Sequence, residues 1–212
     1  MPTVTRLVPQ QRNPRRLNIH LDGRFAFVCT TNVAAKFALS EGAVLSDEQL
    51  AAIQRGHIRQ MCLDDALRIL ERRLHSRAEL ERKLSRKKHA PELIQTVLEE
   101  LRRLGYVDDR RFSQTKASSA AEHRKHGRGR AYRDLLKAGV EGETARRAVE
   151  DVYEQTDSLA IARELALKKA PYLRRLDPLV ARRRLAGMLL RRGFDYEAIR
   201  PVLDEVLGPE PE

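Results

Sequence analysis

Tryptophan is absent from the sequence, and aromatic residues make up 5% of its 212 positions. So small an aromatic content favours a core of leucine, alanine and valine packed between helices over an aromatic-rich β core. The two cysteines, Cys29 and Cys62, are too few for a disulfide framework or a paired-cysteine metal site in a chain of this length. We expect both to be reduced, packed thiols in a cytoplasmic protein.

Long hydrophobic segments are absent as well. No apolar run reaches the roughly eighteen residues of a membrane-spanning helix, and the N-terminus has no signal-peptide core. The sequence therefore predicts a soluble protein that makes no membrane contact.

No group of residues in the sequence is suited to catalysis. The stretch Gly127-Arg128-Gly129 lacks the Lys-Ser/Thr of a phosphate-binding loop, and His123 and His126 have no cysteine or carboxylate at ligand spacing. Asp64-Asp65 and Asp108-Asp109 resemble the paired carboxylates of metal-dependent nucleases. Because aspartate is favoured at helix starts, we expect each pair to cap or open a helix instead. We predict a protein that is not an enzyme, with no cofactor and no metal.

Basic residues are what the sequence has in excess. Lysine and arginine number 41 against 30 aspartates and glutamates, which gives a net charge of +11 and a pI near 10.1. Such a balance does not define a fold, but it predicts a polyanionic partner or an acidic protein surface as partner.

Residues 1–56 form an N-terminal extension that differs from the rest of the chain. Apolar side chains alternate over 17–21 and over 25–29, and the intervening Asp22-Gly23 favours a type I′ turn, so the sequence predicts a β-hairpin. The rest of the expected extension consists of a third strand over Val4–Val8, a mobile basic segment between Pro9 and Pro14, and short helices over 32–39 and from Ser46 through Ile53.

From Ile58 onward the apolar spacing is helical and repeats. A four-residue apolar stripe returns after 51 residues and after a further 54, and the helix before it returns with an arginine at its start. We predict an all-α fold of three tandem three-helix repeats, at 58–107, 108–154 and 157–207, forming an elongated body beside the hairpin. The stripes are Ile94, Val97, Leu98 and Leu101; Ala145, Ala148, Val149 and Val152; and Ile199, Val202, Leu203 and Val206. The arginines are Arg77, Arg128 and Arg182.

The ends of the third helices carry two local signals. Gly105 suits the left-handed residue that ends a helix. Pro201 falls inside the last helix, where a lost hydrogen bond and a clash cost about 3 kcal/mol, so that helix is expected to be kinked or to begin late. Residues 208–212 are expected to be a frayed tail.

Charge follows the repeat. Segments 72–88, 124–137 and 182–192, which contain the second helices, carry net charges of +6, +5 and +5, whereas the third helices are rich in acids. Stacked repeats would present a basic stripe to DNA and a separate acidic stripe to basic residues of a protein partner. A basic stripe that neutralises roughly six phosphates would bind with a log–log salt slope near −5. The acidic last helices disfavour helix-turn-helix readout, in which the last helix enters the major groove.

The residues expected to contact DNA are the basic residues of these segments. They are Arg72, Arg73, Arg77, Arg82, Lys83, Arg86, Lys87, Lys88, Arg124, Lys125, Arg128, Arg130, Arg133, Arg182, Arg183, Arg184, Arg191 and Arg192.

Several runs of the sequence resemble the RecX family of recombination regulators over about residues 60–207. The most specific is Leu-Gly-Tyr-x-Asp-Asp-x-x-Phe at 104–112, and Arg86-Lys87-Lys88-His89 departs from the family's usual Lys-Gly, which bears on the first inter-helix turn. The other similar runs are 66–70, 76–80, Gly127-Arg128, 135–140 and 189–194, and the hairpin at 21–27 is similar to the N-terminal extension of many members.

The resemblance implies a non-enzymatic regulator of RecA, the recombinase that polymerises on single-stranded DNA. Such a protein would bind in the groove of the filament, mainly inhibit its ATPase and strand exchange, and act in recombination, DNA repair and the SOS response. Its partners would be the RecA filament and single-stranded DNA, with double-stranded DNA as a further candidate, and a monomer is expected. The alternatives are an architectural, nonspecific DNA-binding protein without a recombinase partner and a metal-dependent nuclease.

Overall fold

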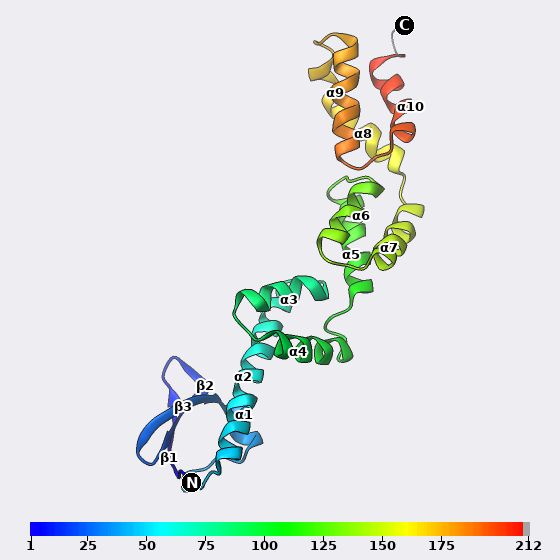
Figure 1. The fold of residues 1–212 in the computed structure, drawn as a ribbon. Helices are drawn as coiled ribbons and strands as arrows, with labels where there is room; N and C mark the ends of the chain where they lie inside the picture. The colour runs from blue at the N-terminus through cyan, green and yellow to red at the C-terminus, as the bar shows by residue number, and fades with distance from the viewer. Residues whose placement is uncertain (210–212) are drawn as a thin grey trace. The chain divides into compact units, whose positions relative to one another are not determined.

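The computed structural model describes residues 1–209, which form a small N-terminal sheet followed by helices (Figure 1). Two compact units are present: residues 1–73 with 81–101, and residues 74–80 with 102 onward. The expected fold class, helical repeats with a small β extension, is confirmed. Among the described residues, no helix is long and apolar enough to span a membrane.

The sheet is antiparallel, with strands β1 (Val4–Gln10), β2 (Asn13–Leu21) and β3 (Arg24–Thr30) in that order. Asp22 and Gly23 have φ values of 48° and 79°, which confirms the predicted hairpin turn. The third strand is confirmed too, but the basic segment between Pro9 and Pro14 is not the loose segment expected. Gln10 pairs with Asn13 across a second hairpin. Pro9 and Pro14 are compatible with this pairing, since they stand near strand ends, where a missing N–H is tolerated.

One core joins the sheet to α1 (Thr31–Lys36) and to the start of α2 (Asp47–Leu70). Ile19 and Ile53 are buried there together with Cys29. Cys29 and Cys62 are both buried free thiols, as predicted. Burial raises the pKa of Cys62 to about 11, with a smaller contribution from the nearby charge of Asp65.

Helix α2 is continuous where two helices and a boundary near residues 56–58 were expected. Ser46 and Gln49 form the predicted capping box at its start. Gly56 lies inside the helix against Phe37, since an added Cβ would be 3.0 Å from the ring. Asp64 and Asp65 stand in the interior of α2, so the expectation that they cap or open a helix is wrong.

The rest of the first repeat consists of α3 (Arg77–Arg86) and α4 (Pro91–Arg103). All four apolar stripe residues of α4 are buried, as predicted. The turn between the helices has Lys88 at φ +65°, where the later repeats have Gly139 and Gly193 at +82° and +89°. The departure from Lys-Gly at this turn therefore leaves its left-handed backbone in place.

The second repeat is α5 (Asp109–Glu122), α6 (Arg128–Lys137) and α7 (Gly142–Glu154), and the third is α8 (Ser158–Leu173), α9 (Pro178–Arg191) and α10 (Tyr196–Leu207) (Figure 1). Each packs around its own apolar cluster, which contains the predicted stripe, with Val152 partly buried. Asp108 caps α5 by accepting hydrogen bonds from the N–H groups of Arg110 and Arg111, as expected for this aspartate pair.

Helix α10 accommodates Pro201 without a late start. It begins at Tyr196, the position equivalent to Pro91 of α4 and Gly142 of α7, so the alternative of a later start is wrong. Pro201 is exposed, where water can replace the missing helical hydrogen bond. Gly208 ends the helix at φ +90°, and residues 210–212 of the expected tail lie outside the described residues.

Candidate nucleic-acid and filament interface

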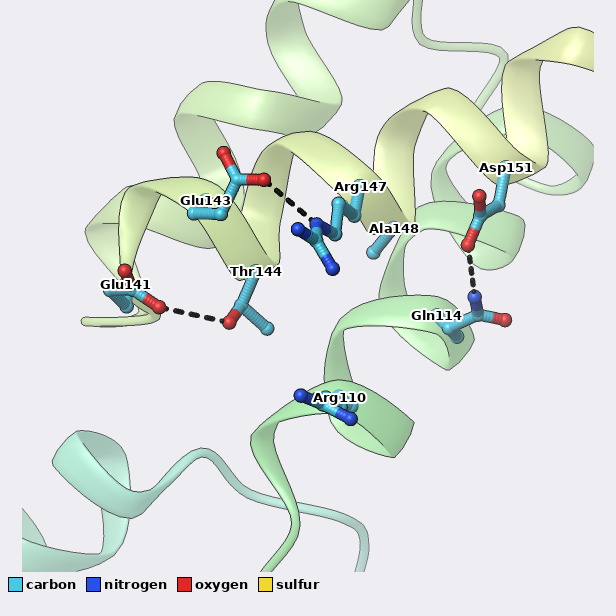
Figure 2. Close-up of a pocket in the computed structure, with 8 residues that line it drawn as sticks. All are labelled: Arg110, Gln114, Glu141, Glu143, Thr144, Arg147, Ala148 and Asp151. Carbon is cyan, nitrogen blue, oxygen red and sulfur yellow. Dashed lines mark hydrogen bonds and ion pairs between the residues drawn. The ribbon is translucent and has the colours of Figure 1, made fainter.

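The acidic third helices use their carboxylates within their own repeats. One acidic position bonds to the first helix of the same repeat in all three cases: Glu100 to Arg59, Asp151 to Gln114 at 2.8 Å, and Glu205 to Arg163 at 2.9 Å. Figure 2 shows the second of these contacts, with Gln114 on α5 and Asp151 on α7. These acids therefore hold the third helix to the first.

The preceding acidic position binds the arginine at the start of the second helix. Glu150 pairs with Arg128 at 3.5 Å, and the equivalent Asp204 pairs with Arg182 at 2.5 Å. Arg182 is only 6% exposed and also donates to the carbonyl oxygen of Gly208 at 3.1 Å. Arg182 stays a predicted DNA contact, but two of its guanidinium nitrogens are already engaged inside the third repeat.

A polar pocket of about 320 Å³ between α5 and α7 shows how far the acids of the second repeat are already paired (Figure 2). Glu143 binds Arg147 at 2.7 Å and Arg146 at 2.7 Å, and hydrogen bonds from these guanidinium groups, chiefly that of Arg146, lower the pKa of Glu143. Thr144 donates to Glu141 at 3.1 Å. Carboxylates engaged in this way present little net negative charge to a partner, which argues against the expected acidic stripe in this repeat.

Backbone contacts join the second and third repeats. Gly127 N–H donates to the carbonyl oxygen of Arg192 at 2.8 Å, and Gly129 N–H to that of Gly193 at 3.0 Å. The Arg192 guanidinium returns to the carbonyl oxygens of Arg124 and Lys125 at 3.0 and 3.4 Å. Arg192 is therefore a joint residue as well as a candidate contact.

The equivalent joint links the start of α3 to the second repeat. Ser76 Oγ donates to the carbonyl oxygen of Ala138 at 2.6 Å and accepts from the Glu79 N–H at 3.1 Å. A Cβ atom added to Gly139 would lie 2.4 Å from that of Ala78. The offsets of the repeat therefore relate the joints as well as the helices. Position 76 maps onto 127 with the 51-residue offset, and position 138 maps onto 192 with the 54-residue offset.

Several other candidate residues also have partners within the protein. Lys87 pairs with Asp65 at 3.0 Å, Lys125 with Glu164 at 3.0 Å, and Arg130 with Asp134 at 3.3 Å. Burial alone would raise the pKa of Asp65, but hydrogen bonds from His89 and Lys87 outweigh it and leave the pKa lowered. Further interactions within the protein involve Arg73, Arg77, Arg82 and Lys83.

The remaining candidates are exposed, and within residues 1–209 no carboxylate lies at ion-pair distance from them. They are Arg72, Arg86, Lys88, Arg124, Arg133, Arg183, Arg184 and Arg191. All three repeats contribute to this set, which we call the unpaired basic residues.

Two features escaped sequence reasoning. The glycine joint was hidden because nothing in the spacing of Gly127, Gly129 and Gly193 shows that they meet. The arginines of the N-terminal extension were not among the candidate contacts, and the role of the hairpin was left open, although residues 1–46 carry a net charge of +4.

These properties define a class of protein: tandem three-helix repeats whose acids are largely used internally and whose exposed arginines suit a polyanionic partner. Three RecX domain signatures match the chain: the N-terminal domain of regulatory protein RecX over residues 2–46, the first three-helix domain over 62–101 and the third over 155–203. The chain belongs to the RecX family of regulatory proteins, as the sequence resemblance indicated.

Curated relatives named regulatory protein RecX support this assignment. That of Bacillus subtilis (strain 168) is 28% identical over 208 residues, which cover 97% of this chain and 78% of the relative. That of Chlorobium phaeobacteroides (strain BS1) is 34% identical over 143 residues, covering 68% of this chain and 91% of the relative.

Solved structures share the fold. A crystal structure of regulatory protein RecX superposes with a TM-score of 0.74 at 22% identity, covering 96% of this chain and all of that one. The crystal structure of RecX from Lactobacillus salivarius gives a TM-score of 0.62 at 22% identity, covering 70% and 96% of the two chains.

Proposed function

We propose that this protein is a non-enzymatic, monomeric cytoplasmic regulator that binds the RecA filament on single-stranded DNA and mainly inhibits its ATPase and strand exchange. Membership of a family of regulatory proteins supports the regulatory role. The observation that carries the proposal is the set of unpaired basic residues, present on every repeat and left without carboxylate partners among residues 1–209.

The physical basis of binding is the neutralisation of phosphates. Exposed guanidinium groups without carboxylate partners are free to form bidentate contacts with phosphate oxygens, and each contact releases condensed counterions from the nucleic acid. Paired residues such as Arg182 or Arg128 would first have to break an internal ion pair. We therefore assign the DNA- and filament-facing contact to the unpaired basic residues, in place of the full set of basic positions.

The internal pairing of the acids changes one part of the expected mechanism. Acids at two positions of the third helices are held by the other helices of the repeat, so recombinase lysines or arginines would have to compete with those bonds. Contacts with RecA are more favourable at acidic surfaces of the recombinase, which the same unpaired arginines can meet.

A titration of the DNA-dependent ATPase of RecA tests this proposal. Filaments are assembled on single-stranded DNA, and this protein is added at ratios far below those needed to coat the DNA. We expect ATP hydrolysis to fall under these conditions. Inhibition confined to coating ratios would overturn the proposal.

Inhibition confined to coating ratios would favour the alternative, an architectural DNA-binding protein without a recombinase partner. The unpaired basic residues are the observation in its favour, because they are sufficient for nonspecific phosphate binding without any recombinase. A parallel incubation of DNA with Mg²⁺ or Mn²⁺ tests the nuclease reading, and we expect intact DNA.

A further inference from the structure

A cleft of about 730 Å³ lies within the N-terminal unit, between the second hairpin and α2. The turn between β1 and β2 and the start of β2 form one wall, with Arg12 in the turn and Arg15 and Arg16 on β2. Helix α2 forms the other, with Arg68 among its lining residues, and residues 30–32 close the end between them. The cleft is formed entirely by the extension and the adjoining part of α2, and no residue of the second helices lines it.

The net charge of this cleft is positive, although Arg68 pairs with Asp65 at 3.5 Å. Four arginines line it against Asp64 and Glu71, and the carboxylate of Asp64 accepts a hydrogen bond from Gln60 at 2.8 Å. Within residues 1–209, the guanidinium groups of Arg12, Arg15 and Arg16 have no carboxylate at ion-pair distance. Arg12 and Arg15 are exposed, and Arg16 is half-buried.

The neutral groups around these arginines are hydrogen-bonding ones. Asn13, Thr31, Asn32 and Gln60 line the cleft, whereas Leu67 and Pro14 are its apolar lining residues. Amide and hydroxyl groups beside arginines are the usual donors to phosphate and sugar oxygens of nucleic acids. An acidic peptide would ordinarily also need a deep apolar pocket for an anchoring side chain, and the lining supplies little of one.

We propose that the N-terminal cleft binds the phosphate backbone of a nucleic acid, as a contact separate from the unpaired basic residues of the repeats. The tip of the hairpin between β1 and β2 then holds the nucleic-acid strand against α2. This inference goes beyond regulation of RecA, since nucleic acid can bind in the cleft whether or not a recombinase is present.

The test replaces the three hairpin arginines in the full-length chain, as Arg12→Gln, Arg15→Gln and Arg16→Gln together. Binding to a fluorescent oligothymidylate is measured as a function of salt. Loss of three phosphate contacts is expected to make the log–log salt slope less negative by about 2, because each contact to a single strand contributes about 0.7.

A matched control loses the same charge in the same unit, as Arg6→Gln, Arg24→Gln and Lys36→Gln, three exposed residues that do not line the cleft. The salt slope of this control is expected to change by less than the roughly 0.7 that one phosphate contact contributes. A double variant that retains the half-buried Arg16 is expected to lose about 1.4 of the slope, and it covers the case in which the triple variant does not fold.

Three outcomes would overturn the inference. They are an unchanged slope in the folded cleft variants, an equal change in the control, and loss of binding to a polyglutamate peptide without any loss of binding to DNA. The last outcome would identify the cleft as a site for acidic protein segments. If cleft variants lose DNA binding while RecA inhibition fails even in the unmodified protein, the cleft contact stands and the proposed regulatory function falls.

Discussion

Substitution of Gly193 tests the joint between the second and third repeats. Gly193 has φ +89°, and an added Cβ would lie 2.1 Å from the backbone nitrogen of Arg130 and 2.5 Å from its Cβ. A left-handed backbone costs an alanine about 1–2 kcal/mol. The overlap involves α6 backbone, so the two repeats must also separate and weaken the hydrogen bonds from Gly127 and Gly129, at about 0.5–1.5 kcal/mol each.

We therefore expect Gly193→Ala to lower the free energy of unfolding by about 2–5 kcal/mol. Gly105→Ala is the matched control, because Gly105 has φ +76° in the same unit but no atom within 4 Å of an added Cβ. The control should lose only the backbone term of about 1–2 kcal/mol. Urea unfolding followed by circular dichroism measures both, and hydrogen exchange at Gly127 and Gly129 should accelerate only in Gly193→Ala. Equal losses in the two variants would refute the close joint.

Three further predictions concern the charged and titrating groups. Arg182→Met should destabilise the third repeat by about 1–3 kcal/mol, since Asp204 and the Gly208 carbonyl lose a charged donor. The salt slope of DNA binding should stay unchanged, and a shallower slope would show that Arg182 contacts DNA. Arg183→Gln with Arg184→Gln should do the reverse, leaving the melting temperature unchanged and making the slope on single-stranded DNA less negative by about 1.4; a lower melting temperature would show that these residues have structural roles. Burial is the largest cause that lowers the pKa values of His57 and His126 below 6.5. The unfolded chain therefore takes up protons first as the pH falls through 6.5, and the melting temperature should decrease from about pH 7.5 to about pH 5.5. The double variant His57→Gln, His126→Gln should reduce this decrease, and an unaltered pH dependence would contradict the assignment.

Local patterns in the sequence predicted most of the helices and strands. The Asp22-Gly23 turn, the Ser46 capping box and the apolar stripe of α4 each depend on neighbours in the chain, and all three are present in the structure. The offsets of the repeat were visible for the same reason, because equivalent helices carry equivalent apolar positions.

What the sequence could not show are contacts between segments far apart in the chain. The contact of Gly56 in α2 with the Phe37 ring, for example, is not visible from spacing. The charge of Arg182 counted toward a binding surface because its pairing with Asp204 depends on how α9 and α10 pack. For the same reason, net charge per helix overstated both the basic and the acidic surface of the repeats.

The central claim is that the unpaired basic residues bind the recombinase filament. It is tested most directly by the affinity of this protein for preassembled RecA filaments on single-stranded DNA, measured for a variant with one substitution in each second helix: Arg86→Gln, Arg133→Gln and Arg184→Gln. The control is Arg6→Gln, Arg24→Gln and Lys36→Gln, which carries the same change in net charge. We predict weaker filament binding with a shallower salt dependence for the first variant and unchanged binding for the control. Equal affinities of the two variants for the filament would contradict the account.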